Sequence, residues 1–217
     1  MGRQIPSWRI MGQARRRVGH GKGSSLMMIH RRILLATAAG TLAATVGPRK
    51  PLARTPVAGV AETLAPLSAG LDPVSPPQDP PDAAFLTQDG TEHHLSEFKG
   101  RGMVVNMWAT WCAPCVAEMP SLEALSKALA PHDIAVLPLS SDRGGADVVQ
   151  AWYQAHGITL LPVLLDPRSA MARAFNARGI PTTVIINTEG KVVARLEGAA
   201  DWSAPAGQAL VRKLAGT

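Results

Sequence analysis

Apolar and polar positions follow two regular patterns along the chain from about residue 83 onwards. Short unbroken apolar runs predict strands buried on both faces of a sheet, and apolar residues that recur every three or four positions predict amphipathic helices. Strands are therefore expected at 103–108, 134–139, 161–165, 184–187 and 192–196, and helices at 114–130, 146–156, 169–175 and 201–214. A β-hairpin over about 85–95, with its turn at Asp89-Gly90, precedes them.

The order of these elements predicts the fold class. Strand, helix and strand alternate through the middle of the chain, and a hairpin and a last helix close it. This order is typical of an α/β sandwich, in which helices cover a mixed central sheet. We expect the sandwich to occupy residues 83–217 as one domain.

Residues 1–47 have the composition of a basic leader with a signal or anchor segment. Arg31 and Arg32 precede an apolar, small-residue run from Ile33 to Val46. At about 14 residues, this run fits a signal peptide and falls short of the roughly 20 residues that span a bilayer. The paired arginines resemble a twin-arginine export signal. Cleavage or retention of the segment, and its export route, stay open.

The segment over residues 48–82 is rich in proline. Nine of the 18 prolines fall within positions 48–81, among few large apolar side chains. Such a composition buries too little surface to offset the entropy of ordering it. We interpret it as a tether between leader and domain. The alternative is an arm that packs on the domain through Leu64, Leu67 and Leu71.

The charge of the chain is unevenly distributed. The formal net charge is +6, but residues 1–54 hold 11 basic side chains and no acidic one. The remaining 163 residues therefore carry a balance of −5. A nucleic-acid-binding domain carries its positive charge on the fold, with aromatic side chains for stacking. Because the excess of positive charge lies in residues 1–54 and aromatics are 4% of the chain, we exclude nucleic acid as a partner.

The only two cysteines, Cys112 and Cys115, lie three positions apart where an expected strand ends and a helix begins. Residues at i and i+3 of a first helical turn share a face and can form a disulfide. The free N–H groups and the dipole at a helix N-terminus stabilise a thiolate. We therefore expect Cys112 to be the attacking thiol, exposed beside Trp111, and Cys115 to resolve the mixed disulfide. Pro114 between them restricts the backbone and withholds an N–H donor.

Three other interpretations compete for the cysteine pair. A structural zinc site needs four ligands, and no histidine is suitably paired with the cysteines. A Cu(I)-binding pair is chemically conceivable, because soft thiolates suit that ion. An inert structural disulfide would constrain little, since it closes so short a loop. Redox exchange is the interpretation that we prefer, and we expect neither a metal nor an organic cofactor.

The stretch from Val104 to Pro120, Val-Val-Asn-Met-Trp-Ala-Thr-Trp-Cys-Ala-Pro-Cys-Val-Ala-Glu-Met-Pro, resembles the active site of the thioredoxin superfamily. More narrowly, it is similar to the TlpA/ResA/CcmG branch of bacterial extracytoplasmic thiol–disulfide oxidoreductases. The resemblance covers about residues 83–217. It implies a thioredoxin fold with an N-terminal hairpin and a central helix–strand insertion over 146–165.

A second stretch, Arg178-Gly-Ile-Pro-Thr-Thr183, resembles the cis-proline loop of the same superfamily. The resemblance places Pro181 opposite the disulfide and the Ile180 backbone where it can pair with an extended substrate segment. X–Pro bonds adopt the cis form at low cost compared with other peptide bonds. Gly179 is expected to permit the turn. The alternative is an ordinary trans proline at a strand edge.

Two polar positions also follow from the resemblance. Asn106 stands six residues before Cys112, where thioredoxin has a buried aspartate that assists proton transfer, and an amide cannot titrate. Glu118 is then the candidate for that role, because it lies one helical turn after Cys115 and the TlpA/ResA branch has an acid there. The alternative for Glu118 is an exposed first-turn glutamate favoured by the helix dipole.

The resemblance implies an enzyme, a protein-disulfide reductase in the periplasm or on the outer face of a bacterial cytoplasmic membrane. We expect a monomer, a membrane electron donor of the CcdA or DsbD kind, and apocytochrome c or a copper chaperone as the disulfide-bearing substrate. An oxidant or isomerase of the Dsb type and a Cu(I)-binding module are the alternatives. Ala113-Pro114 fits the reductive branch, because oxidants commonly have a histidine between the cysteines.

Overall fold

The computed structural model describes residues 65–67 and 70–216, and the predicted leader lies outside them. The strands are β1 (Ala65–Pro66), β2 (Leu71–Gln78), β3 (Ala84–Thr87), β4 (Glu92–His94), β5 (Gly102–Trp108), β6 (Ile134–Ser140), β7 (Leu164–Leu165), β8 (Thr182–Ile186), β9 (Val192–Glu197) and β10 (Ala200–Asp201). The helices are α1 (Ala113–Leu129), α2 (Gly145–His156), α3 (Ala170–Ala174) and α4 (Pro205–Leu214). Short 3₁₀ helices occupy Leu95–Phe98, Ala130–His132 and Pro167–Ser169.

Eight of these strands form one mixed sheet in the order β2-β9-β8-β5-β6-β7-β3-β4. The strands β5, β6 and β7 run parallel, and antiparallel strands extend the sheet on both sides. The fold class is therefore the expected mixed α/β sandwich with an N-terminal hairpin, β3–β4. The helix and strand of the predicted insertion are α2 and β7, and β7 joins the hairpin to the parallel strands.

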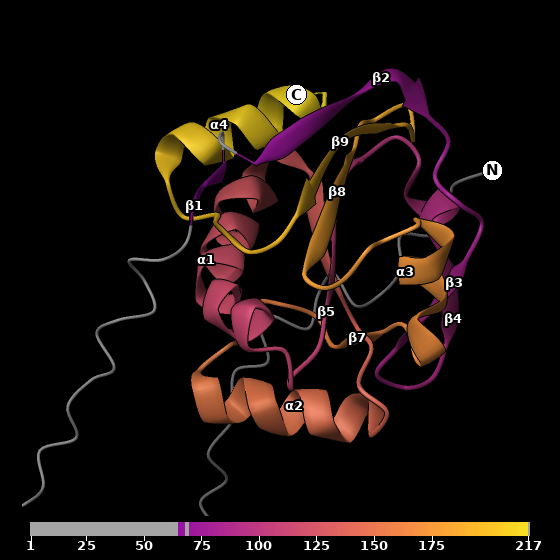
Figure 1. The fold of residues 1–217 in the computed structure, drawn as a ribbon, viewed down its shortest axis with the longest axis vertical. Helices are drawn as coiled ribbons and strands as arrows, with labels where there is room; N and C mark the ends of the chain where they lie inside the picture. The colour runs from indigo at the N-terminus through magenta and orange to yellow at the C-terminus, as the bar shows by residue number, and fades with distance from the viewer. Residues whose placement is uncertain (1–64, 68–69, 217) are drawn as a thin grey trace, which may run out of the picture. The chain divides into compact units, whose positions relative to one another are not determined.

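Side chains of the central strand β5 point alternately to two cores. Val104 and Trp108 belong to the cluster under α1, α2 and α4, whereas Met103, Val105 and Met107 belong to the cluster under α3. Figure 1 shows α1 and α4 on one side of the sheet and α3 on the other. Because successive strand residues face opposite sides, Asn106 faces α1 together with Val104 and Trp108.

The N-terminal boundary of the domain differs from the sequence-based prediction. Leu71 lies opposite Leu196 at the start of the β2–β9 pairing, so residues 71–78 are an edge strand and not part of a tether. Leu67 is only 2% exposed and packs in the core cluster under α1, α2 and α4. The domain therefore begins before residue 83, and the arm interpretation is confirmed at Leu67 and Leu71. Leu64 and the rest of the predicted tether lie outside the described residues.

Three further elements differ at their ends. The strand expected at 161–165 is reduced to Leu164–Leu165, and Pro162, within the missing part, has no N–H to donate to a neighbouring strand. The helix expected at 169–175 begins as a 3₁₀ turn, and the last helix starts at Pro205 because Asp201 belongs to β10. None of the helices within the described residues is both long and apolar enough to cross a membrane.

Candidate active site

Cys112 and Cys115 form a disulfide at the N-terminus of α1, with their Cα atoms 5.2 Å apart. Cys112 is the N-cap residue, and its sulfur accepts a hydrogen bond from the Cys115 backbone N–H at 3.3 Å. Pro114 occupies the first turn, where a missing N–H costs nothing. Cys112 therefore lies between the end of β5 and the N-terminus of α1, as the sequence predicts.

The two cysteines and the neighbouring tryptophan differ in exposure. Trp111 is 69% exposed, Cys112 is 6% exposed and Cys115 is fully buried. The expectation that Cys112 is exposed is therefore wrong. The residue packs in the same core cluster as Cys115 and Met119. The order of the two sulfurs is as expected, since Cys115 lies deeper than Cys112. Trp111 is the most exposed large apolar side chain among the described residues.

The loop before β8 lies directly against the disulfide. The Ile180–Pro181 peptide bond is cis, as the resemblance implies, and the alternative of a trans proline is therefore wrong. The carbonyl oxygen of Ile180 lies 3.6 Å from Cys112 Sγ. Gly179 is not needed for a left-handed turn, because its φ is not positive and a Cβ added to it would meet nothing within 4 Å. The expectation that Gly179 permits the turn is therefore not supported.

The Glu118 carboxylate is buried beside the redox pair. It lies on α1, one turn after Cys115, and it is fully shielded from solvent. Its Oε1 accepts a hydrogen bond from Asn106 Nδ2 at 2.8 Å. Its Oε2 accepts hydrogen bonds from Trp202 Nε1 at 3.0 Å and from the Ala200 backbone N–H at 3.2 Å. The alternative of an exposed first-turn glutamate is therefore wrong.

The environment of Glu118 sets its protonation state. Burial raises the pKa of Glu118 to about 7, because an ionised carboxylate loses its hydration inside the core. The hydrogen bonds from Trp202, Asn106 and Ala200 oppose that rise, since they favour the charged form. The result is a group that can take up or release a proton near neutral pH, one helical turn from a cysteine.

Asn106 links the sheet to this carboxyl group. Its Nδ2 donates both to Glu118 and to Thr183 Oγ1, at 2.8 and 2.9 Å, and the side chain is fully buried. The Asn106 amide therefore acts as a hydrogen-bond donor to the titrating group. Trp202 and Ala200 are the members of this network that the sequence did not reveal, because they lie more than 80 residues from Glu118.

A second carboxylate, Asp142, forms hydrogen bonds with the loop that precedes the disulfide in the chain. It accepts hydrogen bonds from Thr110 N at 2.9 Å, from Thr110 Oγ1 at 2.7 Å and from Ser140 Oγ at 2.7 Å. These contacts tie the end of β6 to the residue before Trp111. The sequence carries no signal that distinguishes Asp142, because an acid just after an apolar strand is common in loops.

The site offers two sulfurs and a carboxyl group, and its chemistry follows from these. Among residues 65–67 and 70–216, no three His, Cys, Asp or Glu side chains lie close enough together to hold a metal ion. A dithiol–disulfide pair exchanges two electrons by sulfur substitution and needs no other group to hold them. The arrangement can therefore perform thiol–disulfide exchange with a proton acceptor at hand.

Comparison with known proteins identifies the family. Residues 77–195 match the AhpC/TSA family. The chain is 30% identical over 112 residues to the thiol-disulfide oxidoreductase ResA of Geobacillus kaustophilus, an alignment that covers 52% of this chain and 63% of that relative. It is also 30% identical over 130 residues to ResA of Bacillus subtilis, covering 60% of this chain and 72% of the relative. The chain thus spans less than two thirds of the first relative's length.

A solved structure supports the same assignment. The crystal structure of an exposed lipoprotein thioredoxin from Streptococcus pneumoniae is 28% identical and superposes with a TM-score of 0.51. The match covers 61% of this chain and 99% of that chain. The predicted thioredoxin fold and the resemblance to the TlpA/ResA/CcmG branch are therefore confirmed. The chain belongs to the AhpC/TSA family and has a thioredoxin fold.

Proposed function

We propose that this protein is a thiol–disulfide oxidoreductase that reduces disulfides of other proteins. The observation that carries the proposal is the position of the Cys112–Cys115 pair at the α1 N-terminus, with the buried Glu118 one helical turn further on. A disulfide that served only to brace the fold would need no titratable group in the adjoining core. The names of the relatives support the same chemistry.

The first half of the reaction begins from the dithiol form. The Cys112 thiolate attacks one sulfur of the substrate disulfide, forms a mixed disulfide and releases the other substrate sulfur as a thiolate. The N–H of Cys115 donates to Cys112 Sγ in the oxidised chain, and the same contact with the free N–H groups of α1 would stabilise the attacking thiolate. The Ile180 backbone beside Cys112 is available to pair with the substrate segment.

The second half releases the product. Cys115 loses its proton, and its thiolate attacks Cys112 Sγ, which expels the second substrate sulfur as a thiolate. Two electrons have then moved from the chain to the substrate, and the two product thiolates take up two protons. Glu118 is the proposed proton acceptor for Cys115, because a carboxyl group whose pKa is about 7 can be ionised before the step and protonated after it.

The proposed reaction leaves the chain as the disulfide, so a dithiol donor must reduce it after each turnover. We propose a membrane electron donor of the CcdA or DsbD kind, on the outer face of a bacterial cytoplasmic membrane or in the periplasm. An exposed lipoprotein among the structural relatives supports this location. The proposed substrates are apocytochrome c before haem attachment or a copper chaperone for cytochrome oxidase.

The reduction potential of the Cys112–Cys115 pair tests the direction of the reaction. Equilibration with a dithiol buffer of known potential, followed by quantification of free thiols, gives its value. A reductase predicts a value near that of thioredoxin, about −270 mV. A value near that of DsbA, about −120 mV, would instead assign the protein as an oxidant of the Dsb type.

A further inference from the structure

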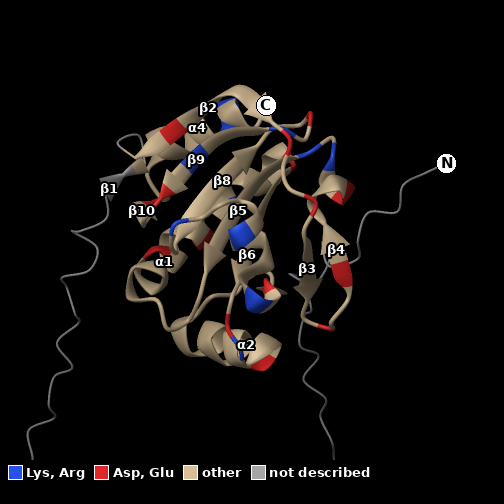
Figure 2. Ribbon diagram, turned by 45° about the vertical axis from the view of Figure 1, so that its right-hand side comes forward, with Lys and Arg blue, Asp and Glu red and all other residues tan. Residues whose placement is uncertain are grey.

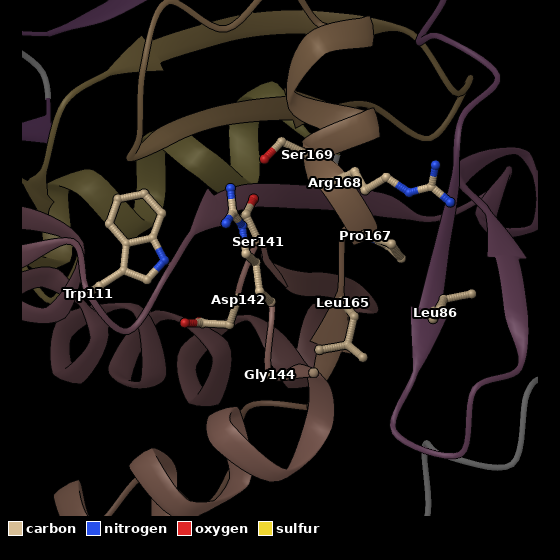
Figure 3. Close-up of a pocket in the computed structure, with 11 residues that line it drawn as sticks. Leu86, Trp111, Ser141, Asp142, Gly144, Leu165, Pro167, Arg168 and Ser169 are labelled. Atoms are coloured by element: carbon tan, nitrogen blue, oxygen red, sulfur yellow. The ribbon is translucent and has the colours of Figure 1, made fainter.

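A groove opens beside Trp111 and runs towards the N-terminal hairpin. Its lining comes from β3, the loop after β6, the start of α2 and the loop after β7. In Figure 3, Trp111 lies at one end and Leu86 at the other, with Arg168 and Ser169 along one side and Asp142 and Gly144 along the other. Its volume is about 1010 Å³, at the upper limit of small-molecule pockets, which span roughly 300–1,000 Å³.

Two arginines line this groove, and neither forms an ion pair within the described part of the chain. They are Arg143 and Arg168, and both are exposed. Three other arginines form ion pairs with acids outside the groove lining, namely Arg101 with Asp133, and Arg178 and Arg195 with Glu197. Figure 2 shows the positions of Lys and Arg interspersed with those of Asp and Glu along the ribbon.

Asp142 is the one acidic residue in the lining, and its carboxylate already forms hydrogen bonds within the domain. Both carboxylate oxygens of Asp142 accept hydrogen bonds, from Thr110 and Ser140, and these contacts fix the loop that carries Arg143. The opposite loop is fixed as well. The buried Asp166 carboxylate accepts the N–H groups of Met171 and Ala172 next to Arg168. Both guanidinium groups are thus carried by ordered loops.

Part of the remaining lining is apolar and adjoins the cysteine that the mechanism uses. Leu86, Leu165 and Pro167 contribute carbon surface, and Trp111 directly precedes Cys112 in the chain. Exposed Trp and Arg side chains are the residue types that contribute most to protein recognition. A substrate whose sulfur reaches Cys112 would place its neighbouring residues over Trp111 and into this groove.

We propose that the groove binds an acidic segment of the substrate protein, next to the substrate's reactive cysteine, through Arg143 and Arg168. This inference rests on the proposed function, since it names the substrate class of the same reaction. Carboxylates match the guanidinium fork in charge and geometry. An acidic flank would raise the rate of productive encounter, and salt would weaken the effect.

The test uses two disulfide-bonded peptides that differ only in the residues flanking one cysteine, three aspartates in one and three lysines in the other. The second-order rate constant for reduction of each peptide by the reduced full-length protein is measured in a single turnover, at low and at high salt. Each exposed charge contact contributes a few-fold at most, so we expect about a fivefold preference for the acidic peptide at low salt. The preference should shrink towards one at high salt and in the variant R143Q/R168Q.

A matched variant, K127Q/K213Q, removes the same charge at two exposed positions outside the groove. Lys127 lies about 22 Å along α1 from Cys112, since each residue adds 1.5 Å. This variant should keep the wild-type preference. Equal reduction of both peptides by the wild type, or an equal loss of preference in the two variants, would overturn the inference. An uncharged small disulfide separates the two proposals, because failure to reduce it would contradict the proposed function itself.

Discussion

The indole N–H of Trp202 donates a hydrogen bond to the Glu118 carboxylate at 3.0 Å, deep in the core beneath the redox disulfide. The two residues are 84 positions apart, so the contact joins the segment before α4 to the first turns of α1. The Ala200 backbone N–H adds a second donor from the same segment. Through these contacts the C-terminal part of the domain influences the protonation state of a group one turn from Cys115.

The raised pKa of Glu118 predicts a specific dependence of stability on pH. A carboxyl group that keeps its proton up to about pH 7 in the folded chain and loses it near pH 4.5 when unfolded stabilises the fold at low pH. That contribution is lost as the pH rises through the folded pKa. Between pH 5 and 8, the free energy of unfolding of the oxidised protein should fall by about 2–3 kcal/mol relative to E118Q.

Denaturant unfolding at both pH values measures this difference. The disulfide stays closed, so cysteine titration does not contribute. The amide introduced by E118Q can be accommodated, because Asn106 can turn its Oδ1, which has no partner among the described residues, towards it. The exposed Glu189→Gln variant should behave as the wild type. Parallel curves for the wild type and E118Q would contradict the buried, titrating carboxyl group.

The variant W202F tests the hydrogen bond itself. Loss of the indole N–H removes an interaction that favours the ionised form, so the pKa of Glu118 should rise further. Stability at neutral pH should fall by about 2 kcal/mol, the typical contribution of a hydrogen bond to a charged group. Carbon NMR of the labelled Glu118 carboxyl follows its titration. W152F, which alters a tryptophan stacked on His156, is the control. An unshifted Glu118 titration in W202F would show that the Trp202 hydrogen bond does not influence the pKa of Glu118.

The site could be predicted from the sequence where its residues are close together in the chain. Cys112 and Cys115 follow a buried strand, and their spacing predicts both the disulfide and its place on α1. The network around Glu118 could not be predicted in this way. The helical pattern gives Glu118 only a polar position near a helix start, and its burial depends on Trp202 and Ala200, whose contacts are set by tertiary packing.

The fold was predictable in its centre and not at its N-terminal edge. Continuous apolar runs predict β5 and β6 because strands covered on both faces exclude polar side chains. The strand β2 contains Pro73, Pro76 and Pro77, which argue against a sheet element when read from composition. Proline is nevertheless tolerated on an edge strand, where an N–H can go unpaired. The strand β2 pairs only with β9, at one end of the sheet.

The variant L67A tests whether the N-terminal arm is part of the folded domain. Leu67 is almost fully buried, and a Cβ added at Gly207 of α4 would meet its side chain. Removing such a side chain leaves a cavity and should cost about 2–4 kcal/mol in the free energy of unfolding. L160A, at a leucine that is 47% exposed, should cost less than about 1 kcal/mol. Similar losses in both variants would contradict the packing of the arm.

The variant D142A tests the anchoring of the loop in front of the disulfide. Three hydrogen bonds from Thr110 and Ser140 would be lost, and the Thr110 N–H would be left without its partner. We expect a loss of about 2–3 kcal/mol in stability and a larger amplitude of motion of the Trp111 indole, measured by ¹⁵N NMR relaxation of its N–H group. D147A, at an exposed acid of α2, should change neither quantity. Unchanged relaxation of the Trp111 indole in D142A would show that the carboxylate does not anchor this loop.

The central claim, that Cys112 attacks a substrate disulfide and Cys115 resolves the product, is tested most directly by trapping. Reduced C115S, mixed with a disulfide-bearing protein substrate, should accumulate a mixed disulfide that peptide mass spectrometry locates at Cys112. Reduced C112S should accumulate far less, because the remaining thiol is fully buried. Equal trapping by the two variants, or no covalent complex with C115S, would contradict the account.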